Sequence, residues 1–233
     1  MWGVVRHILP VILILGAILG SLSLSPSSVA DEAKDKARLS EADISELQLG
    51  AVVSRIWRDP SQDGNVFDAF AAVDITASAA DIWAVMTDCA KSIEVMKDMK
   101  SCTVLSGNAA QGSDIREQVF RTPFPFPQFR TIFKTDYILH QKIKVQKSGG
   151  DMKVQDALWV ITPIGGGKHR VTYKARIGLN LLVPNFMIKR AVRKDTPELM
   201  TALRDVAETI QDAPQARPQV THETLSDLST SKN

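Results

Sequence analysis

The sequence predicts an α+β fold in which one long C-terminal helix covers an antiparallel β-sheet. Between residues 66 and 179, apolar and polar residues alternate in short stretches separated by turn residues, which is typical of strands with one buried face. Between residues 184 and 212, apolar residues recur at three- and four-residue steps, which is typical of an amphipathic helix. Because the strands have one apolar and one polar face, we expect a sheet that is covered on a single side.

Length and composition indicate one folded domain. The chain has 233 residues, of which 44% are hydrophobic, and its formal net charge is +2. A chain of this kind suits a single domain with a substantial core. The nearly balanced charge does not favour nucleic acid or an acidic protein, and we expect no nucleic-acid partner.

The first thirty residues have the pattern of a secretory signal peptide. Arg6 precedes an apolar run over residues 8–22, and the small residues 28–30 stand directly before the acidic Asp31. This order predicts that residues 1–30 are a signal peptide and that the mature protein is exported, either periplasmic or secreted. The alternative is an uncleaved segment that anchors the protein in a membrane, although the run is shorter than the roughly 20 residues of a spanning helix.

The two cysteines of the chain, Cys89 and Cys102, predict a disulfide. In an oxidising compartment such a pair is expected to close its short loop, with a stabilisation of about 3 kcal/mol in the chain-entropy model. The alternative is a pair of buried thiols. No histidine stands near them at the spacing of a metal site, so we expect neither a metal nor a cofactor.

Local signals place the elements in order along the chain. Residues 31–49 are predicted as a charged leader with a short helix capped by Ser40, residues 50–212 as the domain, and residues 213–233 as a disordered tail. The first elements of the domain are expected as a strand led by Ala51–Val53, a strand at Val66–Ile75, a helix with a capping box at Ser78–Asp81, and a short helix at Ala90–Met96.

The rest of the domain alternates strands with turns and ends in the long helix. Further strands are expected at Thr103–Leu105, Ile115–Phe120, Arg130–Leu139, Val154–Ile161 and Val171–Leu179. Ser148–Asp151 and Gly165–Gly167 are predicted hairpin turns. The final helix is expected from Pro184 to Asp212, with a kink or a fresh start at Pro197.

Three motifs, in this order, resemble a known superfamily. Ala71–Ala77 followed by Ile82–Asp88 is similar to an opening strand and a "VWAVLTD" helix, Pro123–Arg130 to a proline- and aromatic-rich segment before an Arg, and Val183–Arg190 to an "IPxWLVN" entry into the last helix. These are features of the START-like and polyketide cyclase-dehydrase (Bet v 1-like) superfamily. The resemblance implies a helix-grip fold, in which a curved antiparallel sheet with two small helices is closed by a long C-terminal helix over an apolar cavity.

The resemblance leaves the ligand open. Members bind sterols, phospholipids, quinones or polyketides, and the coenzyme Q-binding START-type branch is one of the branches that this chain resembles. Two departures prevent a choice, because Gln128-Phe129 replaces the usual acidic residue before the Arg, and Asn185-Phe186 stands where a Trp is often found.

A sheet with an apolar concave face and a covering helix leaves a space that either holds a ligand or is filled by side chains. The candidate lining comes from the inward positions of the strands and helix: Phe133, Tyr137, Val171, Tyr173, Ile177, Leu199 and Leu203. Phe124 and Phe126, on the proline-rich segment, are expected at the mouth. The alternative is that these are ordinary core residues.

A basic cluster, defined as Lys189, Arg190, Arg193 and Lys194, begins the last helix. Such charges attract an anionic membrane surface or lipid headgroup. The alternative is a solvated helix face, although cations near a helix N-terminus oppose its macrodipole.

These features predict an exported protein that binds a lipid or another apolar small molecule, as a carrier or sensor. A cyclase or aromatase is the first alternative, but no catalytic residue is identified: His140 and His169 lie near strand ends, and Tyr137 and Tyr173 are on the apolar face as packing residues. The second alternative is a filled-core, membrane-associated interaction domain.

Overall fold

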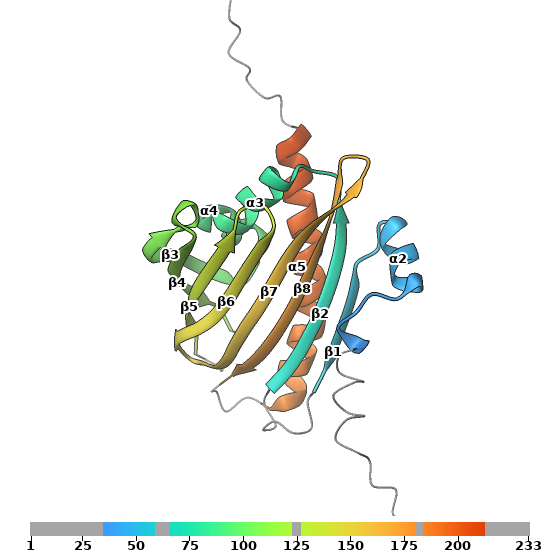
Figure 1. The fold of residues 1–233 in the computed structure, drawn as a ribbon. Helices are drawn as coiled ribbons and strands as arrows, with labels where there is room; N and C mark the ends of the chain where they lie inside the picture. The colour runs from blue at the N-terminus through green and yellow to red at the C-terminus, as the bar shows by residue number, and fades with distance from the viewer. Residues whose placement is uncertain (1–34, 59–65, 123–126, 180–183, 213–233) are drawn as a thin grey trace, which may run out of the picture.

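The fold is described by a computed structural model for residues 35–58, 66–122, 127–179 and 184–212 (Figure 1). The predicted signal peptide 1–30 and tail 213–233 lie outside the described residues. In chain order the helices and strands are α2 (Glu41–Gln48), β1 (Val53–Trp57), β2 (Val66–Ile75), α3 (Ala79–Thr87), α4 (Cys89–Val95), β3 (Met99–Asn108), β4 (Ser113–Phe120), β5 (Phe129–Ile138), β6 (Lys142–Gly150), β7 (Met152–Gly165), β8 (Lys168–Leu179) and α5 (Asn185–Asp212).

The strands form one eight-stranded antiparallel sheet in the order β1-β2-β8-β7-β6-β5-β4-β3. The sheet curves, and the long helix α5 crosses its concave side, with α3 and α4 beside it (Figure 1). The predicted fold class is therefore confirmed: a curved antiparallel sheet, two small helices and one long C-terminal helix.

The firmest packing lies where α5 crosses β2 and β8. Met200, Leu203 and Ala207 of the helix are almost completely buried, and they share a hydrophobic cluster with Val73 and Val171 of the two strands. Burial of aliphatic side chains of this size contributes about 1.5–3 kcal/mol each. This half of the sheet is the packed core of the domain.

Helix α2 covers part of the opposite, convex face. Ser40 caps the helix as the sequence predicts, in a capping box completed by Asp43. Leu47 then packs with Phe70 and Ala72 of β2 in a second buried cluster. The prediction of a sheet covered on a single side is therefore wrong for β2, because the apolar side of α2 is buried only by covering that strand from outside.

Two details of the later elements differ from expectation. Strand β5 ends at Ile138, and Leu139, predicted as the last residue of this strand, is 60% exposed in a turn where His140 has a φ of 56°. A residue just past the end of a strand no longer follows the alternation of its faces. Helix α5 is continuous through Pro197, so the fresh start, one of the two outcomes predicted there, is absent.

Candidate functional site

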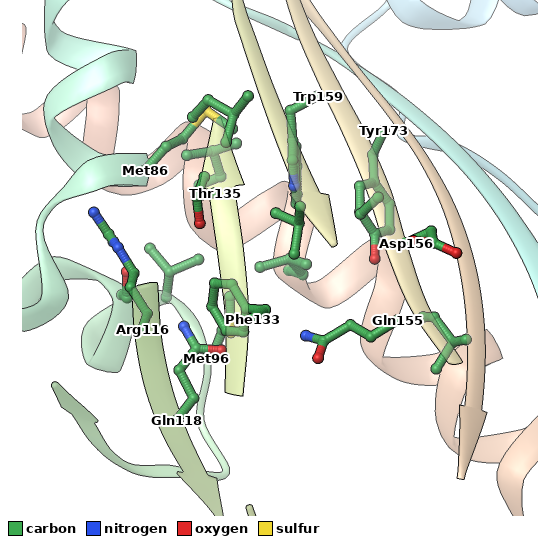
Figure 2. Close-up of a pocket in the computed structure, with 18 of the residues that line it drawn as sticks. Met86, Met96, Arg116, Gln118, Phe133, Thr135, Gln155, Asp156, Trp159 and Tyr173 are labelled. Carbon is green, nitrogen blue, oxygen red and sulfur yellow. The ribbon is translucent and has the colours of Figure 1, made fainter. Parts of the chain in front are cut away.

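An inner cavity lies between the concave face of the sheet and helices α3, α4 and α5. Its volume is about 230 Å³. The wall is mainly apolar and aromatic, with Phe120, Phe133, Trp159 and Tyr173 on the strands and Leu203 on α5. Figure 2 shows the aromatic side chains projecting from neighbouring strands into this space.

A second, outer space of about 350 Å³ adjoins the inner cavity between the end of α4 and the first half of α5. Both spaces are lined by Val95, Met96, Phe120, Tyr173, Ile177 and Leu199. Because they share this wall, we treat the outer space as the approach to the inner cavity. Together they reach the range of about 300–1,000 Å³ that is usual for small-molecule sites.

Five of the seven predicted lining residues lie on this wall: Phe133, Tyr173, Ile177, Leu199 and Leu203. Tyr173 is the most central of them, since it lines both spaces and packs against Trp159 with 4.2 Å between ring centroids.

The other two predicted lining residues, Val171 and Tyr137, are not on the described wall. Val171 lies farther along β8, where the packed core fills the sheet face. The Tyr137 hydroxyl instead donates a 2.8 Å hydrogen bond to Oδ2 of Asp114, and its ring meets Trp83 edge to face. Phe124 and Phe126, expected at the mouth, lie outside the described residues.

One wall of the cavity is polar, and it comes from strand β4. Asp114, Arg116 and Gln118 alternate along the strand and are all buried, with 3%, 4% and 7% of their surfaces exposed. Arg116 and Gln118 line the inner cavity, and Asp114 lies beside them. Burying polar side chains costs free energy unless each has a hydrogen-bond partner, so the partners of these three residues determine what the wall can bind.

The first two members of this row form a buried ion pair. Nε of Arg116 donates a 2.8 Å hydrogen bond to Oδ2 of Asp114, and its Nη2 donates a 2.6 Å hydrogen bond to the carbonyl oxygen of Thr87 at the end of α3. The two side chains are only 5% and 0% exposed. The charge of Arg116 is thus compensated within the protein.

Apart from the exposed Asp156, the remaining polar groups on the wall are uncharged. Gln118 has no hydrogen-bond partner within the described parts of the chain. Gln155 of β7 reaches the cavity from the other side, and its carbonyl oxygen accepts a hydrogen bond from the Thr131 hydroxyl. Burial raises the pKa of the Tyr173 hydroxyl above its ordinary value, which already keeps it protonated at neutral pH.

A disulfide joins Cys89, at the first residue of α4, to Cys102 on β3, with 5.3 Å between their Cα atoms. The segment between the two cysteines supplies Ser92, Val95 and Met96 to the inner cavity. The disulfide therefore fixes one end of the helix that forms this wall.

The basic cluster lies on the exposed surface of α5. Lys194 also lines the outer space, which places the cluster beside the approach to the cavity. Phe186, one turn earlier on the same helix, is 71% exposed. The helix therefore presents an aromatic side chain and several cations together.

Sequence reasoning missed Arg116, Gln118, Gln155 and Trp159, and the contribution of helices α3 and α4. A signal for the first two was available, because charged and amide residues recur at every second position of β4. Neither histidine faces the cavity: His140 contacts Trp83, and Nδ1 of His169 lies 2.8 Å from the carbonyl oxygen of Ala77.

The described residues contain no group of three or more His, Cys, Asp or Glu side chains placed to hold a metal ion. They also contain no helix with the length and apolar character needed to span a membrane.

A curved antiparallel sheet closed by a long helix over an apolar cavity defines a protein of the helix-grip class. The family model described as "Polyketide cyclase / dehydrase and lipid transport" matches residues 75–204, more than half of the chain. The chain belongs to this family. No curated protein matches it significantly in sequence.

Solved structures of the same fold support the class. A STAR-related lipid transfer protein from Xanthomonas axonopodis matches with a TM-score of 0.57 at 14% identity, covering 74% of this chain and 97% of that chain. The lipid transfer and protein localization domain of human StarD13 matches with a TM-score of 0.56 at 14% identity, covering 77% and 94%. The Zhui aromatase/cyclase of a Streptomyces species matches with a TM-score of 0.55 at 10% identity, covering 64% and 97%. At these identities the similarity concerns the fold.

Proposed function

We propose that this protein is an exported carrier or sensor that binds a lipid or another hydrophobic small molecule between its sheet and α5. The observation that carries the proposal is the apolar inner cavity, which adjoins an outer space between α4 and α5. A filled core would leave no such space. The names of two structural neighbours include lipid transfer, and the family description includes lipid transport.

Export has two independent lines of support. Residues 1–30 have the composition of a signal peptide, and Cys89 and Cys102 form a disulfide, which persists in oxidising compartments. Neither observation depends on the cavity, so export and ligand binding are separate parts of the proposal.

Contact with an anionic membrane is the third part. The exposed Phe186 and the basic cluster lie on the turns of α5 that flank the outer space. An aromatic side chain inserts at a membrane interface, and cations there attract anionic headgroups at about 1 kcal/mol each. A ligand leaving the outer space would then enter the bilayer without crossing water.

The alternative is a cyclase-type enzyme, because the family description also covers cyclases and dehydrases. Acid-base catalysis needs titratable groups that face the ligand. On the described wall those are Arg116, which is held by Asp114, Tyr173 and the exposed Asp156. Among the described residues no hydrogen bond joins any two of these three side chains, so the wall holds no positioned acid-base pair, which favours binding over proton transfer.

The experiment that tests the proposal is native mass spectrometry of the protein purified from the periplasm, followed by organic extraction and identification of bound compounds. We expect one apolar compound per protein. Tyr173→Trp places a larger ring where the two spaces meet, and occupancy should fall about tenfold, equivalent to about 1.4 kcal/mol. Lys144→Trp, on the exposed opposite face of β6, is the matched control and should leave occupancy unchanged.

The results of this experiment distinguish a ligand-binding protein from a cyclase and from a protein that binds no ligand. An empty protein that also takes up no apolar dye would refute ligand binding. Binding that survives Tyr173→Trp in a folded protein would show that the ligand occupies another place. A bound compound recovered in a chemically altered form would favour the cyclase.

A further inference from the structure

Gln118 carries an amide on the cavity wall that has no partner among the described residues. It is 7% exposed, it lies on the cavity wall, and within the described residues it makes no hydrogen bond. Figure 2 shows its amide beside Phe133, at the edge of the cavity. Because this amide lies on the cavity wall, water or a ligand inside the cavity can supply its hydrogen bonds.

Two more uncharged donors reach the same cavity. The carbonyl oxygen of Gln155 is engaged by Thr131, which leaves the NH₂ end of its amide to donate elsewhere. Figure 2 shows Gln155 projecting into the cavity from the side opposite Gln118. The hydroxyl of Tyr173 has no hydrogen-bond partner in the described residues either, and it is protonated at neutral pH.

The described wall of the inner cavity offers no free positive charge to an acid. The Arg116 guanidinium is occupied by Asp114 and by the Thr87 carbonyl oxygen. Asp156 of β7 is also among the residues that line the inner cavity, and its exposed side chain adds a negative charge to the wall, not a positive one. A carboxylate or phosphate in the inner cavity would be buried without a counter-charge, which is strongly unfavourable.

The approach to the cavity also disfavours anions. Acidic residues outnumber basic ones around the outer space, which is lined by Glu94, Asp98, Asp195 and Glu198 with Lys97 and Lys194. An anionic ligand would meet this excess of negative charge before it reached the inner cavity.

We propose that the cavity selects an uncharged ligand whose polar group accepts hydrogen bonds, such as a hydroxyl, ketone or ester, and that Gln118 recognises that group. The proposal rests on the proposed function, since it names the class of ligand that the same site takes. Asp114 has the complementary role of keeping Arg116 unavailable to acids.

The test uses Nile red, an uncharged fluorescent dye, displaced at pH 8 by either 1-dodecanol or dodecanoate. The two competitors have the same chain length and differ in the charge of the head. We expect the alcohol to displace the dye at a concentration at least tenfold lower than the acid. Gln118→Leu should weaken the binding of dodecanol about tenfold, which corresponds to the loss of about one buried hydrogen bond. Gln146→Leu, an exposed amide on β6, is the matched control and should change neither competitor.

A second variant changes the charge instead of the amide. Asp114→Asn removes the carboxylate that pairs with Arg116. The affinity of dodecanoate, measured by its displacement of Nile red, should then rise at least tenfold relative to that of dodecanol. If this variant does not fold, the comparison of the two competitors on the wild-type protein still decides the matter.

The inference is overturned if dodecanoate displaces the dye as well as dodecanol, if neither competitor displaces it, or if Gln118→Leu behaves like Gln146→Leu. Wild-type protein that does not bind Nile red at all would instead refute the proposed function.

Discussion

The disulfide between Cys89 and Cys102 should stabilise the domain and hold the helical wall of the cavity. The two cysteines are separated by 13 positions. For a loop of that length, the entropy removed from the unfolded chain corresponds to about 3 kcal/mol. In a domain of this size, 1 kcal/mol shifts the melting temperature by about 2–4 °C, so reduction should lower it by about 6–12 °C.

The assay is thermal unfolding followed by circular dichroism, with and without a dithiol reductant. The double variant Cys89→Ser/Cys102→Ser should melt at the temperature of the reduced wild type and should not respond to reductant. A second readout is the rate at which bound Nile red dissociates. It should rise on reduction, because α4 supplies Val95 and Met96 to both spaces and would lose its tie to β3.

Equal melting temperatures for the oxidised and reduced proteins would refute the argument from the unfolded chain. If reduction lowered the melting temperature but left the dissociation rate of Nile red unchanged, the effect of the disulfide on stability would be separate from any effect on the position of α4. The disulfide would then stabilise the fold, and α4 would keep its place through its packing alone.

Two further predictions concern charged groups on α5. The pKa of Asp195 is raised by its burial and by the nearby Asp98 and Glu198, against the opposing effect of Lys194, so the ionised form is unfavourable in the fold. The wild type should therefore gain stability as the pH falls through that raised pKa. Asp195→Asn should melt at a higher temperature than the wild type at pH 7, and this difference should disappear below about pH 4, where the carboxyl is protonated in both the folded and the unfolded chain. Melting curves recorded across this pH range test the prediction, and a variant that is less stable than the wild type at pH 7 would contradict it. In the basic cluster, replacing Lys189, Arg190 and Arg193 by Gln should weaken binding to phosphatidylglycerol vesicles on the order of 100-fold and leave binding to phosphatidylcholine vesicles unchanged. Co-sedimentation with the two kinds of vesicle measures this. Equal binding of the wild type to both vesicles, or equal binding of variant and wild type, would count against a membrane role.

The parts of the fold that follow from local signals were predictable from the sequence. Ser40 and Ser78 cap α2 and α3 as expected, since a capping side chain bonds within its own turn. Strand β8 alternates cleanly because its inward side chains pack against other parts of the chain. The final helix was equally clear, because its apolar stripe spans many turns.

What the sequence concealed depends on tertiary structure. The turn after β5 contains no Gly or Pro, so nothing marked the end of the strand, and His140 adopts a positive φ that its sequence neighbours do not indicate. Strand β4 was placed correctly, but its buried face is the polar one, with Asp114, Arg116 and Gln118 inward. Hydrophobicity alone predicts the opposite face, because it assumes that every inward position meets an apolar core.

The inward polar residues of β4 lie on the half of the sheet that lines the cavity, whereas the other half is packed against α5. On β2 and β8 the helix α5 packs directly, and side chains such as Val73 and Met200 are completely buried. On the β4 and β5 side a cavity lies between the sheet and α4. A covalent tie from α4 to β3 is found on this side of the sheet. It follows that substitution of the uncharged Gln118 on the cavity wall should alter ligand selection with less loss of stability than truncation of Met200 under α5, because Met200 is completely buried in the packed core.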